Sequence, residues 1–133
     1  MATLDDPGVK SLLDAPNHAV ISTFNPDGSI HSTVAWQEVV DGALQVNSAV
    51  GRRWPTNLDA DPRVTVVVVA QDNPYDYVEV RGTVTRTTDG ADEQIDRLAK
   101  KYLGQDRYPF RREDEQRVRY VLTADRVRHQ KQR

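Results

Sequence analysis

The stretch Val64-Thr-Val-Val-Val-Val69 is nearly all valine. Valine and threonine are branched at Cβ and are enriched in β-strands. An almost continuous apolar run of this kind is typical of a strand that is covered on both faces. Asn73-Pro74 then turns the chain into a long β-rich segment, residues 75–87. The sequence therefore predicts two successive strands here.

Shorter β-segments lie on either side of this pair. Residues 19–24 run into Asn25-Pro-Asp-Gly28, a strong turn signal, and residues 30–40 resume as one strand. Asp41-Gly42 is a hairpin turn, after which residues 44–46 continue the meander. Residues 118–122 alternate like a last strand. This pattern predicts a small six-stranded antiparallel barrel.

Three helical segments are added to the strands. Asp6-Pro7 begins a short helix that ends before Pro16, and a second helix begins near Pro55. The third is amphipathic and is closed by Gly104. Its apolar residues at helical spacing are Ile95, Leu98, Ala99, Tyr102 and Leu103. We expect a mainly β fold with added helices, in a single domain that spans residues 1–133.

Composition excludes several classes of protein. The chain has 133 residues, no cysteine and a net charge of -2. Disulfides, thiolate metal sites and a cysteine nucleophile are therefore excluded, and the charge does not indicate nucleic acid as a partner. The longest apolar run, residues 64–70, is too short to span a bilayer, and the first residues lack the features of a signal peptide. We expect a cytoplasmic protein with no membrane partner.

Most titratable residues fit no catalytic or metal-binding pattern. The three histidines lack the spacing of metal ligands, so no metal site is predicted. The phosphate-binding patterns of Rossmann and P-loop proteins are absent. The acidic run Glu113-Asp-Glu115 is interpreted as a solvated face, and the basic tail from Arg126 to Arg133 as a solvated terminus.

The segment Asn47-Ser-Ala-Val-Gly-Arg-Arg-Trp-Pro-Thr-Asn57 is the exception. Arg52 and Arg53 follow a glycine where a strand gives way to a helix. Two guanidinium groups and the N–H groups of a helix start together form an anion site, to which Ser48 adds a donor. Trp54 adds a flat apolar surface. The alternative is that both arginines pair with nearby surface acids such as Asp59 or Asp61, and residue types alone leave the two readings equal.

The order of several short motifs carries a resemblance to a known family. They cover most of residues 10–104: His18-Ala-Val-Ile-Ser-Thr-Phe-Asn-Pro-Asp-Gly28, Ser32-Thr-Val-Ala-Trp36, Asp41-Gly42, Gly51-Arg-Arg with Asn57-Leu58, Asp61-Pro-Arg-Val64 and Asn73-Pro-Tyr-Asp-Tyr-Val-Glu-Val-Arg-Gly82. The chain resembles the pyridoxamine 5'-phosphate oxidase-like proteins, and within them the branch that uses the 5-deazaflavin coenzyme F-420. Each motif alone is weak, whereas the ordered set is fairly specific.

This resemblance implies a six-stranded split β-barrel of the FMN-binding type, a homodimer and two cofactor grooves between subunits. The cofactor phosphate is then expected in the segment after the third strand, and the ring system along the strand that begins at residue 30. The residues implied for cofactor binding are Ser32, Thr33, Val34, Ala35, Asn47, Ser48, Arg52, Arg53, Trp54 and Asn57. Those implied for the substrate groove or the dimer contact are Trp36, Tyr75 and Tyr77.

One departure from the family pattern bears on the choice of cofactor. Many relatives that use the deazaflavin place a lysine three residues after Gly51, where this chain has Trp54. Arg53 is expected to substitute for it, because a guanidinium suits phosphate at least as well.

The resemblance implies an oxidoreductase that uses coenzyme F-420 to transfer a hydride to an activated double bond of a small organic acceptor. No catalytic residue is assigned. The alternatives are an FMN-dependent oxidoreductase on the same barrel, and a non-catalytic protein that binds such a cofactor or a haem-like ligand.

Overall fold

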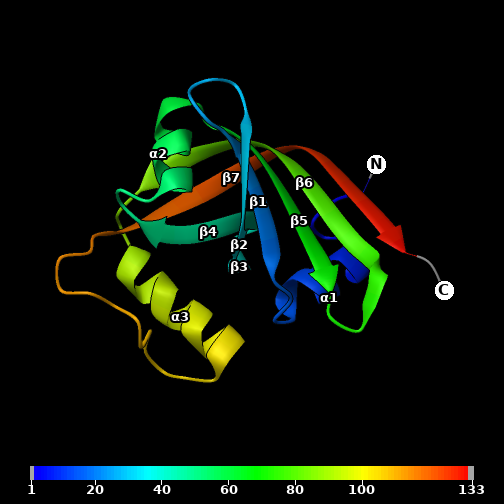
Figure 1. Ribbon diagram of the computed structural model, residues 1–133. Helices are drawn as coiled ribbons and strands as arrows, with labels where there is room; N and C mark the ends of the chain where they lie inside the picture. Colours follow the sequence, from blue (N-terminus) through cyan, green and yellow to red (C-terminus); the bar gives the residue numbers. More distant parts are fainter. Residues whose placement is uncertain (1, 132–133) are drawn as a thin grey trace.

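The computed structural model describes residues 2–131. They form one seven-stranded antiparallel sheet with three helices against it (Figure 1). The strands are β1 (Ala19–Phe24), β2 (Ile30–Ala35), β3 (Gln37–Val40), β4 (Ala43–Ala49), β5 (Arg63–Ala70), β6 (Asn73–Thr87) and β7 (Arg117–Lys131). The helices are α1 (Pro7–Asp14), α2 (Arg53–Ala60) and α3 (Ala91–Leu103). The expected mainly β fold with added helices is confirmed.

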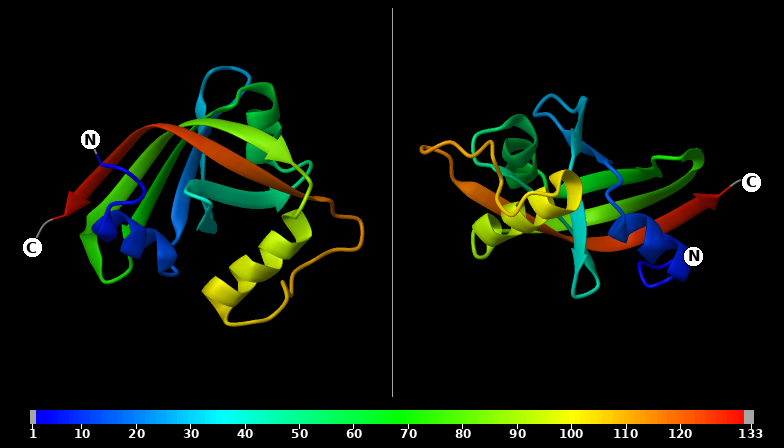
Figure 2. Two further views of the ribbon diagram at one scale, coloured as in Figure 1. Left: turned by 180° about the vertical axis from the view of Figure 1, so that it is seen from behind. Right: turned by 90° about the horizontal axis from the view of Figure 1, so that it is seen from below.

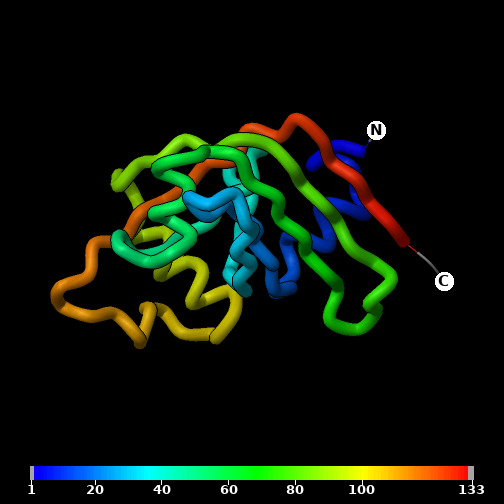
Figure 3. Tube along the Cα trace, turned by 45° about the horizontal axis from the view of Figure 1, so that its top comes forward, coloured from blue at the N-terminus to red at the C-terminus, as the bar shows by residue number. Residues whose placement is uncertain are grey.

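The order of the strands makes the sheet curl. The order is β2-β1-β5-β6-β7-β4-β3, so β2 and β3 lie at opposite margins. These two strands are nevertheless consecutive in the chain, and Trp36 alone separates them. The margins must therefore come together at Trp36, and the sheet is curled into a half-barrel (Figure 3). We call this junction the seam.

The seam also explains the number of strands. The sequence predicts one strand over residues 30–40, whereas the structure divides this segment at Trp36 and so has seven strands rather than six. Ala35 pairs with Ala19 of β1, and Gln37 pairs with Val46 of β4. One extended segment thus leaves one margin of the sheet and joins the other.

The basic tail is part of the sheet, which corrects the expectation of a solvated terminus. β7 extends from Arg117 to Lys131 and pairs with β6 over most of its length. Two side-chain contacts fasten the distal half: a hydrogen bond of 2.9 Å between His129 Nε2 and Asp76 Oδ1, and an ion pair of 3.8 Å between Arg128 and Glu79. Charged side chains alternate there with inward-facing ones, as in any strand with one solvated face. Residues 132 and 133 lie outside the described residues.

The hydrophobic core fills the inside of the curl. β5 contributes Val64, Val66 and Val68, which are buried, whereas Val67 and Val69 on the opposite face are only half-buried. The sequence predicts a strand that is covered on both faces. Within a single chain, β5 is fully covered only on the face that carries Val64, Val66 and Val68. The helices complete the core with Val9, Leu12 and Leu13 of α1 and Leu58 of α2.

The helices divide between the two ends of the sheet. α2 and α3 lie towards one end, and α1 lies towards the other, close to both ends of the described chain (Figure 2). α2 packs on β1 and β2, whereas α3 packs on β7 and β4. None of the helices in residues 2–131 has the length and apolar character needed to cross a membrane.

Candidate functional site

A recess of about 210 Å³ lies between the seam, β4 and the start of α2. α3 and the segment that leads into β7 complete its wall. Its lining residues are Val34, Ala35, Trp36, Asn47, Ser48, Arg52, Trp54, Ile95, Tyr108, Phe110 and Arg117. We call this the seam pocket. It combines apolar and aromatic walls with a few polar groups, which is the usual character of a small-molecule site.

The polar side of the seam pocket lies where β4 gives way to α2. Gly51 has a φ of 99°, a left-handed conformation that glycine adopts without strain, and it turns the chain into the helix. α2 begins at Arg53 without a side-chain cap, so its first N–H groups have no capping partner. Arg52 lies at this helix start. Ser48 is buried, and its hydroxyl has no hydrogen-bond partner among the described residues.

A buried ion pair stands beside Arg52. Nη1 of Arg117 donates to Oε1 of Glu115 at 3.0 Å, and the two side chains are 2% and 4% exposed. The other carboxylate oxygen, Oε2, lies 3.8 Å from Nη2 of Arg52. Glu115 is therefore not part of a solvated face, which corrects the expectation for the run 113–115. Its side chain is covered because β7 begins two residues later and draws the chain inward.

A hydrogen-bond network holds Arg117 and the helix α3 in place. Arg117 Nε donates to Asn47 Oδ1 at 3.0 Å. Asn47 Nδ2 in turn donates to the carbonyl of Ala91 at 2.9 Å and to Gln94 Oε1 at 3.0 Å. Gln94 is fully buried and donates to Gln45 Oε1 at 2.9 Å. Buried groups that are satisfied in this way fix their side chains in one arrangement.

The aromatic side of the seam pocket is centred on Trp36. Its ring stacks on Tyr102 of α3, with centroids 5.3 Å apart and planes 6° from parallel. Tyr108 meets Trp36 edge-on at 5.9 Å and lies 5.7 Å from Phe110. The backbone N–H of Tyr108 donates to Asp96 of α3 at 2.9 Å, which fixes this segment against the helix.

A half-buried lysine, Lys101, connects the seam to the end of α1. Lys101 Nζ donates to the carbonyls of Leu13 and Gln37 at 2.7 and 2.8 Å, so it joins the end of α1 to β3. Burial lowers the pKa of Lys101 to about 8. Burial also raises the pKa of the neighbouring Tyr102, whose hydroxyl donates to the carbonyl of Asn17 at 2.7 Å.

The structure brings seven of the predicted site residues together in the seam pocket. They are Val34, Ala35, Trp36, Asn47, Ser48, Arg52 and Trp54. The surface acids proposed as alternative partners of the arginines are engaged elsewhere: Asp61 pairs with Arg63 at 2.7 Å, and Asp59 with Arg86 at 3.4 Å. Arg52 instead faces the buried Glu115.

The remaining predicted residues lie outside the seam pocket. Arg53 is exposed on α2, and the buried Asn57 donates to Thr23 and Asn25, joining α2 to the end of β1. On β2, Ser32 is exposed and its hydroxyl lies 2.8 Å from that of Ser22, while the half-buried Thr33 pairs with Ile21. The other two, Tyr75 and Tyr77, lie at the start of β6.

Four lining residues were not anticipated from the sequence: Ile95, Tyr108, Phe110 and Arg117. The sequence places Ile95 on the apolar face of α3, but it does not indicate that this residue lines a pocket. Arg117 directly precedes the predicted last strand. A charged residue at the start of a buried strand is a signal for a buried polar site, and it could have identified Arg117. Tyr108 and Phe110 carry no such signal.

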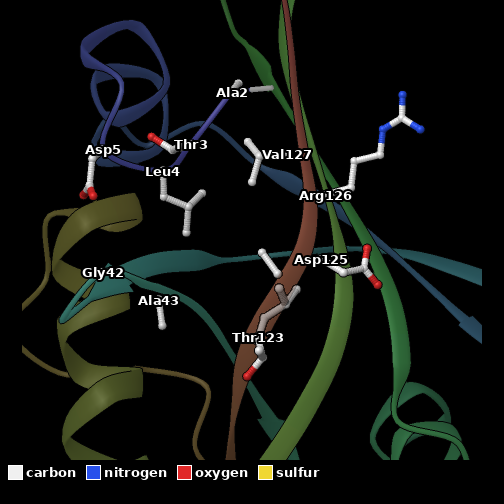
Figure 4. A pocket seen from close by; sticks show the side chains of 12 residues that line it. Ala2, Thr3, Leu4, Asp5, Gly42, Ala43, Thr123, Asp125, Arg126 and Val127 are labelled. Carbon is white, nitrogen blue, oxygen red and sulfur yellow. The ribbon is translucent and has the colours of Figure 1, made fainter.

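A second pocket, of about 460 Å³, lies between the N-terminal segment and β7. Leu4 and Val127 face it, whereas the side chain of Arg126 points away (Figure 4). None of the predicted site residues lines it. Among residues 2–131, no group of three or more His, Cys, Asp or Glu side chains is placed to hold a metal ion.

Comparison with known proteins adds several similar structures. A structure named as an F-420 reductase is 27% identical with a TM-score of 0.77, and the match covers 90% of this chain and 94% of the other. General Stress Protein 26 from Bacillus anthracis is 22% identical with a TM-score of 0.68, covering 92% and 91%. A haem-binding protein from Mycobacterium smegmatis is 18% identical with a TM-score of 0.66, covering 92% of this chain and 52% of the other.

These likenesses confirm the split-barrel fold, since chains of low identity share the whole of it. No curated protein matches the sequence. The family model described as pyridoxamine 5'-phosphate oxidase matches residues 6–131, nearly the full length of the chain. The chain therefore belongs to the pyridoxamine 5'-phosphate oxidase family.

Proposed function

We propose that this protein binds the deazaflavin coenzyme F-420 in the seam pocket and acts as an oxidoreductase. The observation that carries the proposal is the pairing of an anion-binding corner with an aromatic wall in one recess. Arg52, Ser48 and the start of α2 supply donors for a phosphate, and Trp36 supplies flat apolar surface for a ring. Trp54 borders the pocket, but most of its side chain is buried in the core against Tyr120. The likeness to the F-420 reductase supports the same choice.

Each part of the pocket has a role in this proposal. Arg52 holds the cofactor phosphate, and Ser48 donates its unpaired hydroxyl proton to a phosphate oxygen. The backbone of β2 at Val34 and Ala35 lies along the ring system. When bound, the reduced deazaflavin supplies a hydride for transfer to an activated double bond of a small organic acceptor. The protein binds, orients and shields the reactants, so no catalytic triad is needed.

We also propose that a second copy of the chain covers the outer face of β2, β1 and β5. Val20 pairs with Val34 on one side and with Val67 on the other, so all three side chains share this face. Val34 is 65% exposed and Val20 is 38% exposed, and Val67 is half-buried. An apolar face of this kind is typical of a subunit contact. Val34 also borders the seam pocket, so a homodimer would place the pocket beside the partner subunit.

The test is a titration of the purified protein with coenzyme F-420 and, separately, with FMN. Trp36 and Trp54 both line the pocket, so intrinsic fluorescence reports occupancy directly. We expect the deazaflavin to bind more tightly than FMN, and Arg52→Ala to weaken its binding about tenfold to a hundredfold through loss of a charged hydrogen bond. Arg53→Ala is the matched control, because Arg53 lies on the same helix start but outside the pocket, and it should leave binding unchanged.

Other outcomes of this titration identify the alternatives. Tighter binding of FMN would assign the chain to the flavin-dependent members of the family. A third titration, with haem, tests the non-catalytic alternative. Binding of haem, unaffected by Arg52→Ala, with no binding of coenzyme F-420 or FMN would contradict an oxidoreductase and favour a ligand-binding protein. Equal effects of the two arginine variants would contradict the placing of the phosphate at Arg52.

A further inference from the structure

The polar corner of the seam pocket, formed by Ser48, Arg52 and Arg117, has a carboxylate beside its two arginines. Arg52 and Arg117 bring two positive charges, but the carboxylate of Glu115 lies between them, 3.8 Å from Arg52 and 3.0 Å from Arg117. The three groups therefore leave one net positive charge. Glu115 does not line the seam pocket itself, but it contacts the two lining arginines. A phosphate held by Arg52 and Ser48 is therefore bound in the presence of a fixed negative charge directly behind the pocket wall.

Glu115 cannot easily turn away from this position. Its side chain is 4% exposed, and Oε1 is bonded to Arg117, which is itself fixed by Asn47. The other oxygen, Oε2, is buried and has no hydrogen-bond partner among residues 2–131, so it faces Arg52 with its charge only partly balanced. Removing the carboxylate from this site would leave the buried Arg117 without its partner, which is costly.

A fixed carboxylate penalises bound anions in proportion to their charge. The Coulomb energy between Glu115 and a ligand is twice as large for a doubly charged phosphate as for a singly charged one, and it is zero for a neutral ring. Poor access of water to the buried pair reduces the screening of this effect. One net positive charge at the corner neutralises a singly charged phosphate in full. The second charge of a phosphomonoester would lose its water there without a counter-charge, which is costly.

We infer that Glu115 is a specificity-determining residue that adapts the seam pocket to a singly charged phosphodiester and against a doubly charged phosphomonoester. The inference rests on the proposed function, because it concerns the phosphate of the cofactor held there. Coenzyme F-420 carries its phosphate as a diester, whereas FMN carries a monoester. Glu115 would thus separate the two cofactors by the charge of the phosphate group that lies in this corner rather than by the shape of the ring.

The experiment uses three ligands that share one ring and differ in charge. They are 5-deazariboflavin, its 4',5'-cyclic phosphodiester and its 5'-phosphomonoester. Binding is followed by tryptophan fluorescence at about pH 8, where the monoester is doubly charged because its second pKa is about 6. The proteins are the wild type, Glu115→Gln and the control Glu113→Gln, which removes the same charge from an exposed residue of the same segment.

In the wild type we expect the diester to bind at least as tightly as the monoester. Glu115→Gln should strengthen the monoester about tenfold, the diester about threefold and the neutral ring not at all, since the effect scales with ligand charge. Glu113→Gln should change none of the three. A purely structural role of Glu115 would instead shift all three affinities by the same factor, which would overturn the inference.

The wild-type comparison keeps the test decisive even if Glu115→Gln folds poorly. A wild type that binds the monoester more tightly than the diester overturns the inference and leaves the proposed function standing. Failure of the wild type to bind any of the three ligands or coenzyme F-420 overturns the proposed function, and this inference with it.

Discussion

At the scale of single residues, the hydroxyl of Ser48 makes no hydrogen bond to the described residues in the free protein. It is buried without a partner, and an unpaired buried hydroxyl contributes nothing to stability. We expect Ser48→Ala to leave the free energy of unfolding unchanged or to raise it by up to about 1 kcal/mol. Cofactor affinity should fall about tenfold, the worth of one hydrogen bond to a charged group.

Urea denaturation and the fluorescence titration measure these two effects on the same sample. Thr56→Ala serves as a control, since its hydroxyl already donates to the carbonyl of Arg52 and lies outside the seam pocket. A loss of stability in Ser48→Ala without any loss of affinity would show that the hydroxyl has a structural partner instead.

Lys101 gives a prediction about pH. Its pKa of about 8 in the folded protein lies below the ordinary value of 10.5, so the folded state binds fewer protons than the unfolded state between these two values. The free energy of unfolding should therefore rise as the pH rises from 8 towards 10.5. Lys101→Met removes the titrating group, and its free energy of unfolding should lack this rise.

Urea denaturation of both proteins across this pH range checks the slope. The two carbonyl groups that accept from Lys101 Nζ favour the charged form and oppose the effect of burial. Parallel curves for the wild type and the variant would show that these hydrogen bonds cancel the desolvation.

Residues close in sequence account for the part of the site that the sequence could predict. Asn47, Ser48, Arg52 and Trp54 lie within one strand-to-helix junction, so the sequence already groups them as candidate residues of one anion site. Arg117 and Glu115 lie more than sixty residues away and reach the same corner only because β7 pairs with β4. Such a long-range pairing leaves no local pattern, and for this reason the acidic run looked like a solvated face.

At the scale of elements, the pairing of β6 with β7 depends on Gly82. The register between these strands shifts at Arg81 and Gly82, and a Cβ at position 82 would overlap the carbonyl of Thr123. Backbone atoms in a paired strand cannot give way cheaply. We expect Gly82→Ala to lower the free energy of unfolding by about 3 kcal/mol, at the upper end of overpacking costs.

Gly28→Ala is the matched comparison, measured by the same urea denaturation. Gly28 has a φ of 85° but a Cβ there would meet open space, so only the left-handed conformation is strained, by about 1 kcal/mol. Equal losses in the two variants would show that the strands move apart at Gly82 to make room.

The elements themselves were largely predictable because turns and periodicity are local. The turn at 25–28, the hairpin at Asp41-Gly42 and the amphipathic helix α3 all lie where the sequence predicts them. The break at Trp36 was not predictable, since the residues on either side continue the same β-pattern and only the closure of the sheet divides them. The length of β7 was missed because its charged residues resemble a solvated tail when the partner strand is unknown.

At the scale of the whole molecule, the proposed homodimer predicts a change of mass. We expect the wild type to have the mass of two chains in light scattering coupled to size-exclusion chromatography. Val34→Glu places a charge on the exposed outer face of β2 and should yield single chains, because burying an unpaired charge in a contact is costly. Leu103→Glu, an exposed apolar residue at the end of α3, should leave the mass unchanged.

A wild type with the mass of one chain would contradict the homodimer outright. Single chains from both variants would instead place the contact on a broader surface than the outer face of β2, β1 and β5.

The position of β7 in the strand order has a consequence for biosynthesis. β7 lies between β6 and β4 in the sheet, yet the ribosome makes it after every other strand. Until then the hairpin of β3 and β4 has no sheet to join, and β6 presents an open margin of unpaired backbone groups. Such margins are where nascent chains aggregate. During translation the open margin of β6 and the β3–β4 hairpin must therefore be kept from aggregating until Arg117 and the residues beyond it emerge.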